Sequence, residues 1–164
     1  MDAELTAHGL NEVGYWMIAN YASISHLRPQ CPFGIGFELP EEWKERPNVV
    51  YAFVVGTSVM YVGETGAGMR SRFAGYRYGN PLVRDTDNRV KLGITQALTE
   101  GNLVHIWASQ PIAHLTLPTG ILEGPASKLL EGHLIDLFRP PWNRHSPPKF
   151  TAIPSYPPGL PATQ

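Results

Sequence analysis

The chain has 164 residues and a formal net charge of −1; 43% of its residues are hydrophobic and 16% are charged. These values exclude a wholly disordered chain and a polybasic nucleic-acid binder, and 16 glycines with 16 prolines disfavour a long-helix bundle. Cys31 is the sole cysteine, which excludes an intrachain disulfide. The first residues lack signal-peptide order, and the longest apolar run, residues 49–55, is too short to cross a membrane. We therefore expect a soluble cytoplasmic protein.

The charge is segregated along the chain. Residues 1–48 carry a net charge of −4, residues 49–92 of +3, residues 93–139 of −2 and residues 140–164 of +2. The near-neutral total therefore conceals a basic middle stretch, and nucleic acid stays open as a partner.

The first 47 residues are predicted to be mainly helical. Apolar residues recur at spacings of three and four from Leu10 to Ile24, which favours a helix. Prolines and glycines make residues 29–40 irregular, and residues 41–46 suit a short helical turn.

Two strands and two helices are predicted next. β-Branched and aromatic residues favour strands at 49–55 and 59–62, joined by a tight turn. A helix is expected over about residues 67–78, and a second helix begins at the N-cap Asp87 and ends at Gly101.

The remaining pattern is a strand, a helix and a tail. An apolar run predicts a third strand at 103–108, and Pro125 suits the first turn of a helix that ends near Phe138. The last 25 residues hold eight of the 16 prolines, so we expect them to be extended or disordered.

A few residues in this pattern have side chains that could bind a metal or take part in catalysis. Glu131 lies on an apolar helix face, where an unpaired charge is costly, so it either pairs with an arginine or binds a hard cation such as Mg²⁺. Tyr51 and Tyr61 flank the tight turn and could point to one face of the sheet, or could simply pack as strand aromatics. Arg72 could project over that face or form an ordinary salt bridge.

Other polar residues have simpler interpretations. The glycine-rich loop at 63–68 lacks the ending of a phosphate-binding P-loop and is interpreted as a turn. The histidines lack zinc-ligand spacing, so His133 is expected at the surface rather than in a metal site. Lys128 is also expected at the surface. His105, in the third strand, is open as a residue near the site.

The strings VVYAFVVGTSVMYVG, RSRFAGY and LLEGHLIDLFRPPWN, in this order, resemble the GIY-YIG nuclease domain. Val49-Val50-Tyr51 replaces the first signature, Gly-Ile-Tyr, and Tyr61-Val62-Gly63 is close to the second. The resemblance covers about residues 48–143. It implies an α/β (α+β) fold in which helices flank a small three-stranded antiparallel sheet. A helical accessory segment at 1–47 and a proline-rich tail at 144–164 would extend it.

The resemblance also implies hydrolysis of phosphodiester bonds with Mg²⁺, for which Mn²⁺ can substitute. Glu131 would bind the metal, and Tyr51 would orient or deprotonate the attacking water. Tyr61 would hydrogen-bond near the nucleophile, and Arg72 would neutralise charge on the phosphoryl group. A phenolate at Tyr51 requires a lowered pKa, which the metal and Arg72 would favour.

Three further residues are implied with less direct roles. Asn143 would tie the end of the domain onto the site through backbone hydrogen bonds. Tyr76 stands where some related restriction enzymes have a histidine, which is a better proton acceptor. The loop before the helix at residues 67–78 has one residue more than the family pattern. Arg70 is therefore an alternative to Arg72 as the catalytic arginine.

Within the family, the chain is most similar to short type II restriction endonucleases, since an accessory segment precedes the domain and a basic helix is inserted in it. This similarity implies a sequence-specific DNA endonuclease that acts as a homodimer, without membrane attachment or a nucleotide cofactor. The alternatives are a repair, mobile-element or antiphage nuclease acting on branched or single-stranded DNA, and a non-catalytic binding module. The candidate DNA contacts are the remaining bases of the basic stretch: Arg70, Arg77, Arg84, Arg89 and Lys91.

Overall fold

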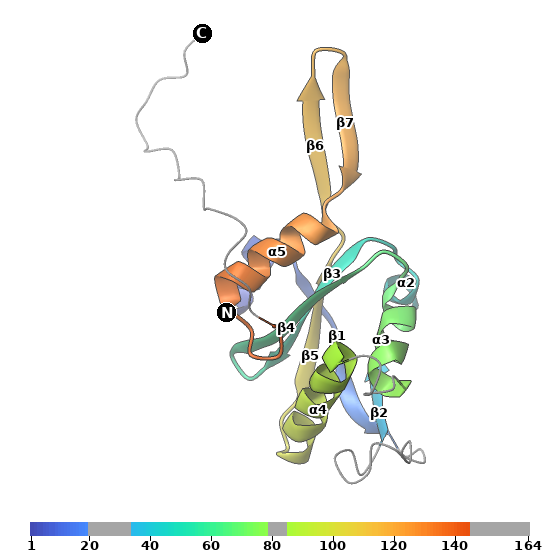
Figure 1. The fold of residues 1–164 in the computed structure, drawn as a ribbon, viewed down its shortest axis with the longest axis vertical. Helices are drawn as coiled ribbons and strands as arrows, with labels where there is room; N and C mark the ends of the chain where they lie inside the picture. The colour runs from blue at the N-terminus through green and yellow to red at the C-terminus, as the bar shows by residue number, and fades with distance from the viewer. Residues whose placement is uncertain (20–33, 79–84, 145–164) are drawn as a thin grey trace.

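A computed structural model describes residues 1–19, 34–78 and 85–144 of the chain (Figure 1). The helices are α1 Asp2–Ala7, α2 Glu41–Lys44, α3 Met69–Tyr78, α4 Asp85–Thr99 and α5 Ser127–Phe138. The strands are β1 Asn11–Ala19, β2 Gly34–Glu38, β3 Val49–Val55, β4 Ser58–Thr65, β5 Val104–Ser109, β6 Ile112–Leu117 and β7 Gly120–Pro125.

The main sheet has five antiparallel strands in the order β2-β1-β5-β3-β4. The three strands expected from the sequence, β4, β3 and β5, form one half of it. The prediction of a three-stranded sheet is therefore too small, because β1 and β2 add to the free edge of β5. This leaves β4 as one outer strand, where its backbone groups need other partners.

The two faces of this sheet have separate cores, as the alternation along β3 requires. Tyr51 and Phe53 lie on the face covered by α3 and α4, in a core that includes Trp16 and Phe73. Val50, Ala52 and Val54 lie on the other face, where they pack with apolar residues of α1 and α5. Strand β3 is therefore buried on both faces, which explains its continuous apolar run.

The helix predicted from Leu10 is wrong, because residues 11–19 form β1. A bulge between Glu12 and Gly14 breaks the alternation of a regular strand, which leaves the helix-like spacing that misled the prediction. The favourable strand propensity of the aromatic and β-branched residues of this segment, with Trp16 fully buried, determines the outcome. The rest of the predicted helix, including Ile24, lies outside the described residues.

Most later predictions are close to the structure, with shifted boundaries. Helix α4 begins at Asp85, before the predicted N-cap Asp87, and α5 begins at Ser127 because Pro125 still belongs to β7. The hairpin formed by β6 and β7 was not predicted from the sequence. The proline-rich tail beyond residue 144 lies outside the described residues, and no helix within them is long and apolar enough to cross a membrane.

Candidate active site

Three tyrosine hydroxyls meet on the α3 side of the sheet. Tyr51 in β3 and Tyr61 in β4 lie on the same face, as the tight turn between their strands predicts. Tyr76 in α3 joins them: its Oη lies 2.7 Å from Tyr51 Oη and donates a hydrogen bond to Tyr61 Oη at 3.1 Å. We call Tyr51, Tyr61 and Tyr76 the tyrosine cluster.

Gly63 makes room for this cluster. It lies opposite Tyr51 in the β3–β4 ladder, and a Cβ atom at Gly63 would lie 2.7 Å from Tyr51 Oη. Any side chain here would push the phenol away, so the glycine of Tyr61-Val62-Gly63 serves a steric purpose.

Arg72 borders the tyrosine cluster, and Arg70 does not. The guanidinium carbon of Arg72 lies 4.5 Å from the ring centroid of Tyr76, and its Nη1 donates to Asp87 Oδ1 at 2.8 Å. Arg70, two residues earlier on α3, is exposed and forms ion pairs with Glu41 and Glu45. Of the two rival arginines, only Arg72 is next to the phenols.

Burial raises the pKa of the Tyr51 hydroxyl well above its ordinary value, and the pKa of Tyr76 is raised for the same reason. The charge of Arg72 lowers both values, as expected from the sequence, but this effect is smaller than the cost of burying a phenolate. In the protein by itself, both hydroxyls are therefore protonated at neutral pH, and the lowered pKa expected for Tyr51 beside a bound metal stays a prediction.

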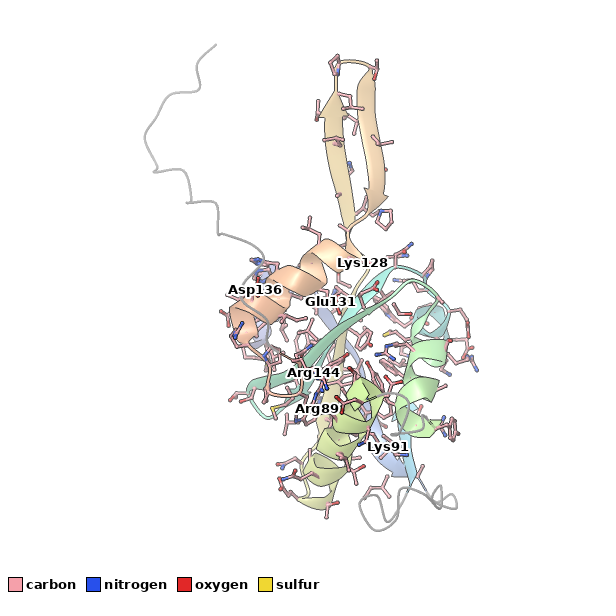
Figure 2. The ribbon with its side chains drawn as sticks, viewed as in Figure 1. Arg89, Lys91, Lys128, Glu131, Asp136 and Arg144 are labelled. Atoms are coloured by element: carbon pink, nitrogen blue, oxygen red, sulfur yellow. The ribbon has the colours of Figure 1, made fainter. Side chains whose placement is uncertain are left out.

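Glu131 lies on α5, on the side that faces the strands (Figure 2). Burial and, as a smaller cause, the negative charge of Glu64 together raise the pKa of its carboxyl to about 7, while the charge of Arg72 acts in the opposite direction. The carboxyl of Glu131 thus interacts with Glu64 of β4 and with Arg72, which borders the tyrosine cluster. Among the described residues, no arginine forms an ion pair with Glu131, so the simple salt bridge of the alternative interpretation is not found there.

The second carboxylate, Glu64, is a site residue that the sequence analysis missed. It accepts a hydrogen bond of 3.3 Å from the hydroxyl of Ser127, which is one helical turn before Glu131 on α5. Both acidic side chains therefore lie between β4 and the start of α5. The available signal was the position of Glu64, a carboxylate directly after Tyr61-Val62-Gly63.

The outer edge of β4 is covered by side chains and by the end of the domain. Asn143 Oδ1 accepts from the backbone N–H of Val62 at 2.9 Å, and Asn143 Nδ2 donates to the Val62 carbonyl at 2.8 Å. The backbone N–H of Trp142 donates to the carbonyl of Met60 at 2.9 Å. Asn143 thus makes the expected backbone hydrogen bonds, and its amide takes the place of a neighbouring strand.

The candidate DNA contacts are mostly occupied by partners in the protein. Lys91 is only 3% exposed and donates to the carbonyl of Arg77 at 2.7 Å, which satisfies the end of α3 rather than a phosphate. Arg77 donates to the carbonyl of Ile35, and Arg89 donates to that of Trp142. Arg84 lies outside the described residues.

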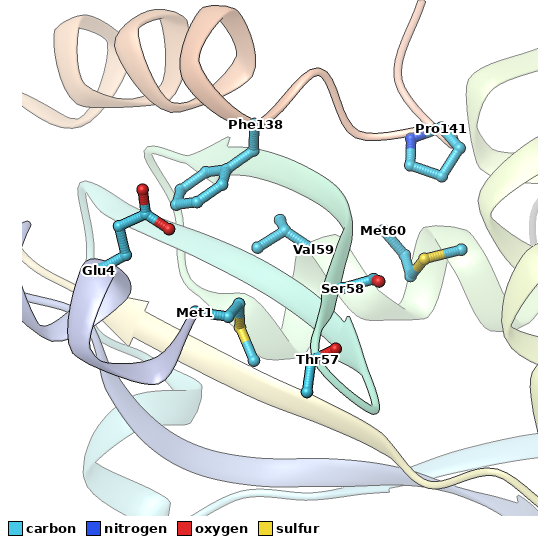
Figure 3. A pocket seen from close by; sticks show the side chains of 8 residues that line it. All are labelled: Met1, Glu4, Thr57, Ser58, Val59, Met60, Phe138 and Pro141. Atoms are coloured by element: carbon cyan, nitrogen blue, oxygen red, sulfur yellow. The ribbon is translucent and has the colours of Figure 1, made fainter.

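His105, His133 and a hollow beside α1 lie apart from this site. His105 is on the opposite face of the sheet from the tyrosine cluster and pairs with Glu12 at 2.6 Å, while His133 contacts His8 at the surface. Figure 3 shows a hollow between α1, the β3–β4 turn and the end of α5. It is lined by Met1, Glu4, Thr57, Ser58, Val59, Met60, Phe138 and Pro141, none of them a predicted site residue.

Comparison with known proteins adds a relationship to this geometry. The chain is 33% identical over 98 residues to endonuclease II of enterobacteria phage T4, a match that covers 58% of the chain and 71% of the phage protein. A solved structure of a glutamate-to-alanine mutant of bacteriophage T4 EndoII aligns with a TM-score of 0.55 at 25% identity, covering 87% of this chain and 98% of that chain. The restriction endonuclease HPY188I in complex with product DNA aligns with a TM-score of 0.48 at 18% identity, covering 84% and 77%. No protein-family model matches the chain.

Proposed function

The chain belongs to the family of endonuclease II of phage T4, and from this relationship we propose that it is a Mg²⁺-dependent DNA endonuclease of the GIY-YIG class. The observation that carries the proposal is the meeting of Glu131, Arg72 and three tyrosine hydroxyls, which come from four different elements. A carboxyl with a raised pKa, an arginine and hydroxyls within hydrogen-bonding distance of one another have the mutual geometry expected of an active site.

A divalent cation suits the carboxylates of this site. Glu64 and Glu131 lie together, and the charge of Glu64 helps to hold the pKa of Glu131 at about 7. Hard cations prefer carboxylate oxygen, and a bound cation would relieve the repulsion between two carboxylates. Glu131, with Glu64 beside it, would hold Mg²⁺, which when bound stabilises charge on the leaving 3′-oxygen and on a phosphate oxygen.

The other residues would position the reactants and balance charge. Arg72, held by Asp87, would face the phosphoryl group and neutralise the negative charge that develops there. Tyr51, as a neutral phenol, would orient the attacking water through its hydroxyl, while Tyr61 and Tyr76 hold that hydroxyl in place. Asn143 would act indirectly, by keeping β4 and the end of the domain together.

Two finer functions fit this chemistry. A sequence-specific type II restriction endonuclease, acting as a homodimer in the cytoplasm, is the function that the sequence favours. The relationship to a phage endonuclease favours the second candidate, a nuclease of mobile-element type that acts on branched or single-stranded DNA. Both require two cuts for a double-strand break, and a chain with one site makes one cut at a time.

We expect Mg²⁺ or Mn²⁺, but not EDTA, to support cleavage of plasmid DNA. Discrete bands would identify a restriction enzyme, and a smear would identify a nonspecific or structure-selective nuclease. Glu131→Ala should abolish cleavage because the metal loses its ligand, while DNA binding measured by fluorescence anisotropy is mostly retained.

Glu100→Ala is the matched control, because Glu100 is an exposed residue directly after α4 and bonds to Gln96 rather than to any candidate site residue. It should cleave as the wild type does. Undiminished cleavage by Glu131→Ala would remove Glu131 from the metal site, and the absence of any cleavage by the wild type would identify a binding module instead.

A further inference from the structure

Two histidine rings meet on the side of the sheet that α1 and α5 cover, although they are 125 positions apart in the sequence. His8 follows α1 directly and His133 lies on α5, and their Nε2 atoms are 3.1 Å apart. The ring centroids are 5.1 Å apart, and the much shorter distance between the Nε2 atoms shows that the rings face each other with these nitrogens. Only the fold brings the two rings together, because no short-range spacing connects them.

The core beneath the two rings fixes their positions. Leu5, one helical turn before His8, and Leu134, directly after His133, are both fully buried in this core. Figure 3 shows that α1 and the end of α5 lie on either side of one hollow. Two side chains on packed elements lose little conformational freedom when they bind one ligand together.

The hydrogen bonds of His8 determine which of its nitrogen atoms carries the proton. Its Nδ1 lies 2.8 Å from the backbone carbonyl oxygen of Glu4. A carbonyl only accepts, so Nδ1 of His8 is protonated and donates this hydrogen bond. In the neutral ring, Nε2 then has a lone pair directed at His133. Histidines that bind metals usually have this arrangement, in which the other ring N–H donates to a carbonyl or a carboxylate.

The ring of His133 can take the matching tautomer. In the metal-free chain, its Nε2 donates a hydrogen bond to Nε2 of His8. Because His133 is exposed, water can remove this proton and deliver another to Nδ1 of the same ring. Both Nε2 atoms would then present lone pairs to one ion, without a change in the charge of either ring.

The distance between the two nitrogens suits the ligands of one metal ion. Zn–N bonds of about 2.0–2.1 Å would span 3.1 Å at an angle of about 100°, close to the tetrahedral geometry that zinc prefers. Imidazole suits Zn²⁺, Cu²⁺ and Ni²⁺, whereas Mg²⁺ prefers oxygen ligands. The histidine pair therefore suits a different class of ion from the carboxylates of Glu64 and Glu131.

We infer that His8 and His133 form a binding site for a borderline divalent cation such as Zn²⁺. Within the described residues, no group of three or more His, Cys, Asp or Glu side chains could hold a metal, so water completes the coordination. A site with two protein ligands holds its ion more weakly than the four-ligand sites of structural zinc, and the ion exchanges with solvent. The bound ion links α1 to α5 and stabilises the folded chain by mass action.

Isothermal titration calorimetry of the full chain with ZnCl₂, in buffer that contains excess Mg²⁺, tests this site. The wild type should have one Zn²⁺ site that the double variant His8→Ala, His133→Ala lacks. Each single alanine variant should bind Zn²⁺ at this site at least tenfold more weakly, because one of the two protein ligands is lost. His114→Ala is the matched control, since His114 is an exposed imidazole that pairs with the carboxylate of Glu123, and it should bind as the wild type does.

His133→Gln separates metal binding from the hydrogen bond. Its side-chain amide still offers an N–H to Nε2 of His8, but it is a poor ligand for Zn²⁺. Without metal, the variant should unfold at a temperature close to that of the wild type. Added Zn²⁺ should raise the unfolding midpoint of the wild type and of His114→Ala, and should leave that of His133→Gln unchanged.

Three outcomes would overturn the inference: a wild type that binds no more Zn²⁺ than the double variant, undiminished binding by either single alanine variant, or a midpoint that Zn²⁺ raises equally in His133→Gln. The first would leave the histidine pair as a hydrogen bond only. Plasmid cleavage with Mg²⁺ is a separate readout, because the ion at this site takes no part in the proposed nuclease reaction. A chain that binds Zn²⁺ here and cleaves no DNA would sustain this inference and refute the nuclease.

Discussion

At the scale of single residues, burial sets the chemistry of the site more strongly than any one charge. Tyr51 and Tyr76 are fully buried, so their hydroxyls stay protonated and satisfy each other by hydrogen bonding. Arg72 and Glu131 are half-buried and lie at the rim of the cluster, where a substrate phosphate would meet them first. In the proposed mechanism, the neutral phenols would thus help to orient the attacking water, while Arg72 would bind the phosphate and Glu131 the metal.

The choice between the two rival arginines makes a direct prediction. Arg72→Ala should lower the cleavage rate by at least about 100-fold, because an arginine aimed at developing charge is worth several kcal/mol. Arg70→Ala removes an exposed arginine paired with two exposed glutamates, and such pairs contribute little, so near-native rates are expected. Rates from single-turnover cleavage compare the two; loss in Arg70→Ala alone would reverse the assignment.

The raised pKa of Glu131 predicts how stability depends on pH in metal-free buffer. The carboxyl titrates near pH 7 in the folded chain and at 4.5 otherwise, so both states hold the proton below pH 4.5. Between pH 4.5 and pH 7, Glu131 is ionised in the unfolded chain but still protonated in the folded chain, so the free energy of unfolding falls as the pH rises. Above pH 7 both states are ionised, and the free energy of unfolding falls no further for this reason. For a partly exposed group, this loss is about 2 kcal/mol.

Glu131→Gln removes this titration without changing the shape of the side chain. In urea unfolding with EDTA, the variant should match the wild type near pH 4.5 and exceed its stability by about 2 kcal/mol at pH 8. Parallel stability curves for the two proteins would show that Glu131 carries no such cost.

At the scale of elements, the site depends on how the outer edge of β4 is covered. The segment after α5 returns along β4, where Trp142 and Asn143 bond to its backbone. Helix α4 holds this segment from the other side, since Arg89 donates to the carbonyl of Trp142 and Gly93 lies against the indole ring. An edge strand that carries two site residues is thereby kept in place.

Gly93 is the most sensitive point of this arrangement. A methyl group at Gly93 would overlap the ring of Trp142, so Gly93→Ala should destabilise the protein by about 1–2 kcal/mol, although alanine is the better helix former. Gly124→Ala meets no neighbouring atom and is the control, with a change near zero. Chemical denaturation measures both, and a more stable Gly93→Ala would mean that Trp142 packs elsewhere.

At the scale of the whole molecule, one sheet unites the segments that the charge pattern separates. The acidic first stretch contributes β1, which lies between β2 and β5, and its Trp16 packs against Phe53 and Phe73 of the later elements. Among the described residues of the basic stretch, Arg70, Arg72 and Arg89 pair with carboxylates, and Arg77 and Lys91 donate to backbone carbonyls. Most of these side chains are therefore held by partners in the protein, although only the carboxylates offset their charge.

The continuity of the sheet predicts the result of removing residues 1–47. A chain of residues 48–164 would lose β1, β2 and the fully buried Trp16, and would expose the edge of β5 and part of the core. It should lose cooperative thermal unfolding, as followed by near-ultraviolet circular dichroism with the full chain as reference. A cooperative transition at the original midpoint would show that the first 47 residues are an independent accessory segment.

The sequence by itself determined the elements whose signals are local. Propensity and turn chemistry predict strands β3 and β4 and helix α3, because short-range interactions favour these elements whatever the rest of the fold is. Motif spacing predicts the order of the candidate site residues Tyr51, Tyr61, Arg72 and Glu131. The common face of Tyr51 and Tyr61 also follows, since a tight hairpin leaves few registers open.

Only the tertiary structure decided the features that depend on distant neighbours. Residues 11–19 form a strand because they pair with the free edge of β5. Lys91 is buried because it donates a hydrogen bond to the carbonyl of Arg77 at the end of α3. Glu64 became a partner of Glu131 because α5 returns along β4, and the pKa of Tyr51 rose because helices closed over it. Burial and long-range pairing are properties of the folded chain, and no local pattern encodes them.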